Sequence, residues 1–164
     1  MSRSFSLLKV LHERLDELFL LHQESLLDQQ PDDREWGDQA LARLDRYADA
    51  LAEHIRLEED LLLPVYRRAG SITGGPEEFY TGEHARLLQI LARCRALLLE
   101  LREGPVDRRR RTIRLFDQEA VFKSLTEHHH QREENILFPT LDQVTDEAER
   151  NRLIQLCLGE EPAP

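Results

Sequence analysis

The sequence has few cysteines and no long apolar run, and each absence narrows the class of protein. Its two cysteines, Cys94 and Cys157, have no CxxC-type neighbour, so we expect neither a disulfide framework nor a thiolate metal site. Both fit the apolar pattern of a helix and are predicted to be buried. No stretch of about 18 apolar residues is present, which argues against a membrane span.

Other absences concern location and partners. The first residues meet charges too early to form the apolar core of a signal peptide, so we expect a cytoplasmic protein that does not bind membranes. The net charge of -10 argues against nucleic-acid binding, which depends on Lys and Arg neutralising phosphates. With 40% hydrophobic and 33% charged residues, the composition is that of a globular chain. A length of 164 residues suits one domain, residues 1–164.

Strand patterns are also absent, and three turn-forming stretches divide the chain into four long helical segments. The stretches are DQQPDD at 28–33, AGSITGGP at 69–76 and REGPVD at 102–107. In each segment, apolar residues recur at alternating spacings of three and four, which is typical of one buried helix face. The sequence predicts an all-α fold, an up-down-up-down four-helix bundle over about residues 4–142. A short fifth helix is expected at about 145–158, with Thr145 as its N-cap.

Polar residues interrupt the apolar face of all four predicted helices. Each face carries a histidine, and the second and fourth also carry a glutamate. The residues are His12, His54, Glu58, His84, His129 and Glu133. In each His-Glu pair the members are four apart, so both side chains point to nearly the same side of the helix. A buried carboxylate costs several kcal/mol unless it is paired, hydrogen-bonded or bound to a metal.

The two stretches that contain the glutamates are similar to each other. HIRLEEDLLLP (54–64) and HHQREENILFP (129–139) agree at the histidine, both glutamates, two apolar positions and the proline, 75 residues apart. The chain therefore has the pattern of two copies of a helix pair. Their prolines, Pro64 and Pro139, are expected to distort or end the second and fourth helices. Distances from the turns place all four histidines at similar height in an antiparallel bundle.

Four imidazoles and two carboxylates in one layer favour a metal site. Nitrogen and oxygen donors without thiolate suit iron, manganese or zinc, and two carboxylates able to bridge indicate two ions rather than one. A tetrahedral structural zinc would leave too few positions for this donor set. The alternative is a metal-free bundle whose histidines hydrogen-bond the glutamates, although two glutamates in one core layer would repel each other.

These residues resemble the hemerythrin-like domain, also called the HHE cation-binding domain, over nearly the whole chain. Both repeated stretches are similar to the family's H-x-x-x-E-E-x-x-L-F-P signature. The resemblance implies that the same six residues hold a non-haem di-iron centre, oxo- or hydroxo-bridged, with Glu58 and Glu133 as bridging ligands. Manganese or zinc would be the substitutes for iron.

The resemblance also implies a protein that binds or reacts with O2, NO or peroxide, in sensing, stress response or iron handling. Oxygen-carrying hemerythrins have a fifth ligand histidine on the third helix, where this chain has Leu88, and an aspartate bridge, where it has Glu133. The ligand set is more similar to that of bacterial members linked to nitric-oxide and oxidative stress and to repair of iron centres. Those repair proteins often carry an extra Cys-containing domain, which this sequence does not show. Ferritin-type Glu-x-x-His bundles fit less well.

Two other functions stay open at this point. One is an O2 carrier or storage protein, and the other is an interaction module whose metal is structural. No catalytic residue is assigned, because no separate acid, base or nucleophile is evident outside the six residues. No protein partner is predicted, and the chain is expected to be a monomer or a homodimer.

The run EHHHQREENILFP at 127–139 contains three adjacent histidines, and the repeat selects one of them. The register shared with the earlier stretch selects His129, together with Glu133. His130 and Glu134 are also four apart, but they share a stripe with charged residues and are predicted to face solvent. His128 is predicted to flank the site.

Two further residues were weighed as neighbours of the site. Tyr80 is predicted to be a core residue whose hydroxyl reaches an edge, and the alternative is a hydrogen-bond donor near the metal. His22 lies about 80° from the direction of His12 around the helix and is predicted to be on the surface.

Overall fold

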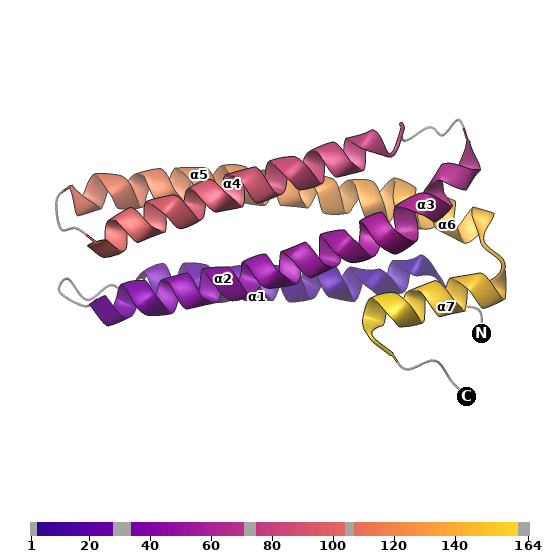
Figure 1. The fold of residues 1–164 in the computed structure, drawn as a ribbon, viewed down its shortest axis with the longest axis horizontal. Coiled ribbons are helices and arrows are strands. Elements are labelled where there is room, and N and C mark those ends of the chain that lie inside the picture. Colours follow the sequence, from indigo (N-terminus) through magenta and orange to yellow (C-terminus); the bar gives the residue numbers. More distant parts are fainter. Residues whose placement is uncertain (1–2, 28–33, 71–74, 104–106, 161–164) are drawn as a thin grey trace.

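The protein is a bundle of antiparallel helices in the computed structural model, which describes residues 3–27, 34–70, 75–103 and 107–160 (Figure 1). Helix α1 (Lys9–Leu27) packs on α2 (Arg34–Leu57), α4 (Glu78–Glu103) packs on α5 (Arg108–Arg132), and α2 also packs on α4. The described residues contain no strand. The predicted all-α, four-helix bundle is confirmed. None of the helices in these ranges is long and apolar enough to cross a bilayer.

The second and fourth helices continue through a π-helical turn, and each turn ends just before a proline. After α2 come the π turn η2 (Glu58–Leu62), α3 (Leu63–Tyr66) and the 3-10 turn η3 (Arg67–Ala69). After α5 come the π turn η4 (Glu133–Leu137) and α6 (Phe138–Val144). A proline has no N–H and clashes with the carbonyl four residues earlier. The predicted distortion at both prolines is therefore confirmed, and its form is a π turn.

The fifth helix, α7 (Glu147–Leu158), packs against the 3-10 turn η1 (Phe5–Leu8) that precedes α1 (Figure 1). Its N-cap is Asp146, whose carboxylate accepts a hydrogen bond from the Glu149 amide at 2.8 Å. The prediction of Thr145 as N-cap was wrong. That residue still belongs to the end of α6, where its hydroxyl donates to the Leu141 carbonyl at 2.7 Å.

Two apolar clusters form the core, and the polar layer lies between them. The first cluster includes Tyr47 and Phe122, and the second includes Tyr66 and Ile154 of α7. Every long helix passes from one cluster through a histidine into the other. In α1, for example, Leu8 of the preceding turn belongs to the second cluster and Leu15 to the first, with His12 between them. Helix α4 follows the same order, whereas the antiparallel helices α2 and α5 run from the first cluster toward the second.

The two cysteines are buried, as predicted, one in each apolar cluster. Burial raises the pKa of the Cys94 thiol to about 12, and it raises the pKa of the Cys157 thiol to about 12 as well. Neither forms a disulfide. Both are therefore inert core residues and take no part in the polar layer.

Candidate metal centre

The six residues predicted as metal ligands lie together in one buried layer. Each long helix contributes one histidine, and a glutamate is the first residue of each π turn. Their exposed fractions run from 0% for Glu133 to 6% for His54. The residues are His12, His54, Glu58, His84, His129 and Glu133. The common depth of the four histidines, expected from the turn positions, is therefore observed.

The layer contains two overlapping groups of four potential ligand atoms. In each group, one nitrogen or oxygen from every member lies within 4.8 Å of the others. Both groups include both glutamates, and they differ in their histidines. One group has His12 and His54, and the other has His84 and His129. Two positions for a cation therefore lie next to each other and share their carboxylates.

Glu58 divides its two oxygens between the groups. Its Oε1 lies 3.2 Å from Nε2 of His54, and its Oε2 lies 3.1 Å from Nε2 of His84. Because Glu58 follows His54 by four positions, both side chains stay on the same face of the helix. A carboxylate that faces two groups in this way has the geometry of a bridging ligand.

Glu133 repeats this arrangement from the opposite side of the layer. Its Oε2 lies 2.8 Å from Nε2 of His12, and its Oε1 lies 2.7 Å from Nε2 of His129. Like Glu58, it begins a π turn, in which its carbonyl accepts the amide five residues on. Single π turns inside α-helices are frequent at functional sites. Both glutamates of the layer thus lie at the same local distortion.

Many polar atoms of the layer have no hydrogen bond of good geometry to the described residues, although imidazoles lie close to them. These atoms are both oxygens of Glu58 and of Glu133, both ring nitrogens of His54, and Nε2 of His12. A buried polar atom left unsatisfied costs about 1–3 kcal/mol, and more when it is charged. Two neighbouring carboxylates also repel each other. Two cations would satisfy these atoms, apart from Nδ1 of His54, so the residues fit a pair of metal ions.

Three further glutamates orient the histidines from outside the layer. A carboxylate oxygen lies 2.8 Å, 2.9 Å and 3.3 Å from Nδ1 of three of them, in the pairs Glu59–His84, Glu83–His129 and Glu134–His12. A carboxylate accepts a hydrogen bond from Nδ1–H, and this bond fixes the tautomer that leaves Nε2 available. Metal-binding histidines almost always have such a partner.

These three glutamates were not among the residues predicted from the sequence, although the sequence carries a signal for two of them. Glu59 and Glu134 are the second glutamates of the two E-E pairs in the repeat. Each crosses to the histidine of the other half of the chain, Glu59 to His84 and Glu134 to His12. Their recurrence one residue after a predicted ligand was the available signal.

His54 lacks this support among the residues that the structure describes. Its Nδ1 is buried without a hydrogen-bond partner. The repeat explains the difference. In the second half, Glu83 precedes His84 and contacts His129, which corresponds to His54. In the first half, the residue that precedes His12 is Leu11, which has no side-chain oxygen to contact His54. The two cation positions therefore have unequal surroundings.

The charges of the layer stabilise one another. Burial alone would lower the pKa of His129, but Glu133, Glu58 and Glu83 raise it well above its usual value. Burial alone would raise the pKa of Glu133, but His129 and His12 lower it well below its usual value. Cations would bind here by displacing imidazole protons, as at other histidine sites.

The prediction that His130 faces solvent was wrong. Its exposed fraction is 7%, and its ring stacks on that of His12 with a centroid distance of 3.9 Å. Burial, followed by the charges of His12 and other imidazoles, lowers the pKa of His130 to about 3. His130 shares a helix stripe with charged residues, but α5 is buried on more than one side. His128, in contrast, has a side chain that is 62% exposed.

The prediction that His22 lies on the surface was also wrong, since its exposed fraction is 0%. Its Nδ1 donates to the Ala40 carbonyl at 3.1 Å, and its Nε2 lies 3.0 Å from a Glu119 oxygen. The other oxygen of Glu119 accepts from the Gln23 amide at 2.9 Å. The pair lies among residues of the first apolar cluster, apart from the candidate centre. It was missed because only the direction of His12 was treated as buried.

Tyr80 is a core residue with an exposed fraction of 0%. The prediction that its hydroxyl reaches an edge was wrong. The hydroxyl is buried without a hydrogen-bond partner among the described residues. Its ring lies 6.4 Å from that of His129 and 5.4 Å from that of Tyr66. The ring of Tyr80 therefore lies next to the His84–His129 group.

A groove of about 670 Å³ between α1 and α5 leads to the layer. Its lining includes the buried rings of His12 and His130. It also includes exposed residues such as Glu13 and Glu127. The groove therefore joins solvent to one side of the candidate centre.

A helical bundle with a buried layer of histidines and glutamates defines a cation-binding class of protein. The Hemerythrin HHE cation binding domain matches residues 3–118 and, in a second match, residues 75–156. The chain belongs to this family, as its resemblance suggested. The two matches overlap between residues 75 and 118, in agreement with the repeated helix pair. No curated protein and no solved structure gave a significant match.

Proposed function

We propose that this protein holds two iron ions in the buried layer, with Glu58 and Glu133 as bridging ligands. The observation that carries the proposal is the sharing of both glutamates between two groups of histidines. Each ion would have two imidazole nitrogens, from His12 and His54 or from His84 and His129, and two carboxylate oxygens. Mixed nitrogen and oxygen donors suit iron, with manganese and zinc as substitutes.

When bound, a di-iron centre supplies the ability to bind or react with O2, NO or peroxide, and we propose a role in sensing, stress response or iron handling. The chain's own residues hold the imidazoles in place through the three outer glutamates. The apolar clusters on both sides of the layer keep bulk water out, and the groove gives small molecules a route inward. The hydroxyl of Tyr80 can donate a hydrogen bond near His129.

We further propose that the protein acts in the cytoplasm on a small molecule rather than on nucleic acid. The two buried, unpaired cysteines suit a reducing compartment. The net charge of -10 opposes binding to phosphate backbones. The first observation supports the cytoplasmic location, and the second supports a small molecule rather than nucleic acid as the partner.

The test is anaerobic reconstitution with Fe(II), followed by metal analysis and by optical spectra after separate exposure to O2, NO and peroxide. About two irons per chain and an oxo-to-iron charge-transfer band in air are expected. Glu133→Gln should lose iron, whereas Glu127→Gln, on the exposed side of the same helix, should retain it. Wild-type protein with well under two irons per chain and no such band would count decisively against the proposal.

A further inference from the structure

His130 is a buried imidazole that the proposed function does not use. It lies on α5, one residue after His129, with an exposed fraction of 7%. Its Nε2 is buried and has no hydrogen-bond partner among the residues that the structure describes. Buried side-chain nitrogens nearly always have a partner, so an unpaired one needs an explanation.

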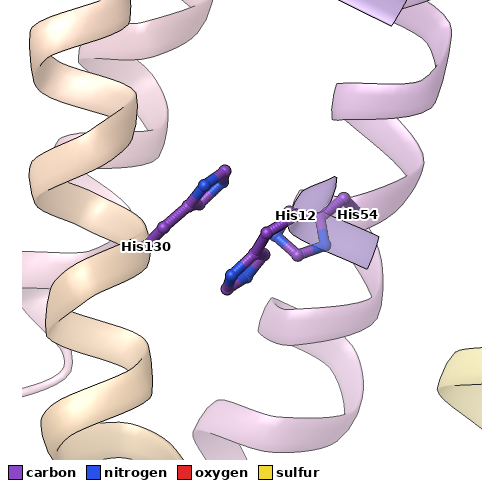
Figure 2. Close-up of side chains that lie close together, drawn as sticks. All are labelled: His12, His54 and His130. Atoms are coloured by element: carbon purple, nitrogen blue, oxygen red, sulfur yellow. The ribbon is translucent and has the colours of Figure 1, made fainter. Parts of the chain in front are cut away.

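The ring of His130 faces the histidines of one cation position. Figure 2 shows it extending from α5 toward His12 and His54. It is parallel to the ring of His12 at 3.9 Å and approaches that of His54 edge to face at 6.1 Å. One ring nitrogen from each of the three lies within 4.8 Å of the other two. The three histidines thus form a third ligand group, which shares His12 and His54 with one of the groups described above.

Consecutive residues of α5 can reach both cation positions because these positions lie side by side. His129 and His130 point about 100° apart around the helix. His129 belongs to the group of His84, and His130 belongs to the group of His12. One helical turn can therefore serve both ions without any change in the backbone.

The internal repeat shows that His130 is peculiar to one half of the chain. The counterpart of His130, 75 residues earlier, is Ile55. Ile55 is also buried, with an exposed fraction of 6%, but it has no atom that can bind a metal. The two cation positions therefore differ here, because only the one near His12 has an additional imidazole beside it.

We propose that His130, through Nε2, is a third histidine ligand of the ion held by His12 and His54. This inference rests on the proposed function, since it requires both ions. The first ion would then have three imidazole nitrogens, and the second would have two. The second position, held by His84 and His129, would then keep more open coordination sites than the first.

The first test compares metal release from His130→Ile and His128→Ala. The isoleucine copies the residue that the other half has at this place, so it suits a buried position, and His128 is an exposed neighbour that serves as the control. Each protein is loaded anaerobically with Fe(II) and then mixed with an excess of a ferrous chelator. In His130→Ile, one of the two ions should leave about tenfold faster or more than in the wild type, and His128→Ala should match the wild type. Wild-type rates in His130→Ile would overturn the proposal.

The second test needs no substitution. In the Co(II)-loaded wild type, each coordinated imidazole contributes one exchangeable, paramagnetically shifted N–H signal to the proton NMR spectrum in water. Five such signals are expected, and four would overturn the assignment of His130. A wild type that does not take up two ions would instead contradict the proposed function. Failure of the inference and failure of the function are therefore distinguishable.

Discussion

Each histidine of the buried layer has two ring nitrogens, and for three of the four the protein controls which nitrogen faces the cation positions. The control comes from glutamates outside the layer, such as Glu59 at 2.8 Å from Nδ1 of His84. A hydrogen bond of this kind fixes the ring and raises its basicity as a ligand. The outer glutamates therefore matter for metal affinity although they would not touch the metal.

Glu59→Gln should lower metal affinity without unfolding the protein. The amide can still contact His84, but it no longer supplies a charged acceptor for Nδ1–H, and loss of such a partner typically costs about 10–100-fold in affinity. Competition with a ferrous chelator measures the change. Glu17→Gln, an exposed residue of α1, is the matched control and should leave the affinity unchanged. An affinity for Glu59→Gln equal to that of the control would show that the contact does not support a ligand.

The three adjacent histidines should differ in their effect on iron content. His129→Ala removes a residue of the layer with an exposed fraction of 1%, so it should cost more iron per chain than His128→Ala. His130→Ala should lie between them, because the first ion would keep two imidazoles, whereas His129→Ala would leave the second ion with one. Metal analysis after anaerobic loading gives the order. Equal losses in His128→Ala and His129→Ala would mean that the register of the ligands on α5 is wrong.

The sequence could predict the six residues of the layer because they recur in register and lie on apolar faces. It could not predict the burial of His130 and His22. Both lie off the stripe that was taken as the inner face of their helix, and only the packing of neighbouring helices decides how wide the buried side is. Glu83 was beyond reach for a similar reason, because its partner, His129, lies on another helix.

At the scale of the helices, the prolines of the repeat determine where the regular α-helix changes to a π turn. Pro64 and Pro139 predicted a distortion, but not that it would be a π turn beginning at the bridging glutamate. Nothing in the composition of the turn distinguishes a kink from an extra residue in the helix. The N-cap of α7 shows the same limit, since Thr145 and Asp146 both suit an N-cap and only the end of α6 decides between them.

The buried pair of His22 and Glu119 should contribute strongly to stability. The pair joins α1 to α5, and His22 also holds the Ala40 carbonyl of α2. His22→Leu leaves Glu119 buried with only the Gln23 amide as a partner, which should lower the free energy of unfolding by about 3 kcal/mol or more. Urea unfolding measures this loss.

The double variant His22→Leu/Glu119→Leu is the control for this pair. It removes both polar groups from the apolar cluster, so it should regain much of the stability that the single change loses. Iron content should match the wild type in both variants, because the pair lies outside the candidate centre. A loss below about 1 kcal/mol in His22→Leu would show that the contact is dispensable.

For the whole molecule, the polar layer lies between the two apolar clusters of the core that the described residues form. The two carboxylates of the layer repel each other, and without cations only the neighbouring imidazoles offset that repulsion. Cations that bind the folded chain and not the unfolded chain stabilise the folded state by mass action. The fold was predictable in outline from the four helical periods, whereas the division of its core follows from how the helices pack.

Metal should therefore raise the melting temperature of the protein. At a free metal concentration about 100 times the dissociation constant, binding adds about 2.7 kcal/mol. For a chain of this size, that corresponds to a rise of about 5–10 °C. Thermal unfolding followed by circular dichroism, under anaerobic conditions with Fe(II) or with a chelator, measures the shift. His129→Ala should show a smaller rise, and an identical melting temperature with and without iron in the wild type would favour a metal-free bundle.

Each half of the chain holds half of the candidate centre. The pair α1–α2 with the turn η2 supplies His12, His54 and Glu58, and the pair α4–α5 with the turn η4 supplies the matching set for the other half. Two identical helix pairs related by a twofold axis would assemble the same ligands, so a protein of one pair would form its centre only as a homodimer. Joining the two copies in one chain makes the centre independent of protein concentration. It also allows a residue to differ between the halves, as Ile55 in the first half and His130 at the corresponding position of the second half illustrate.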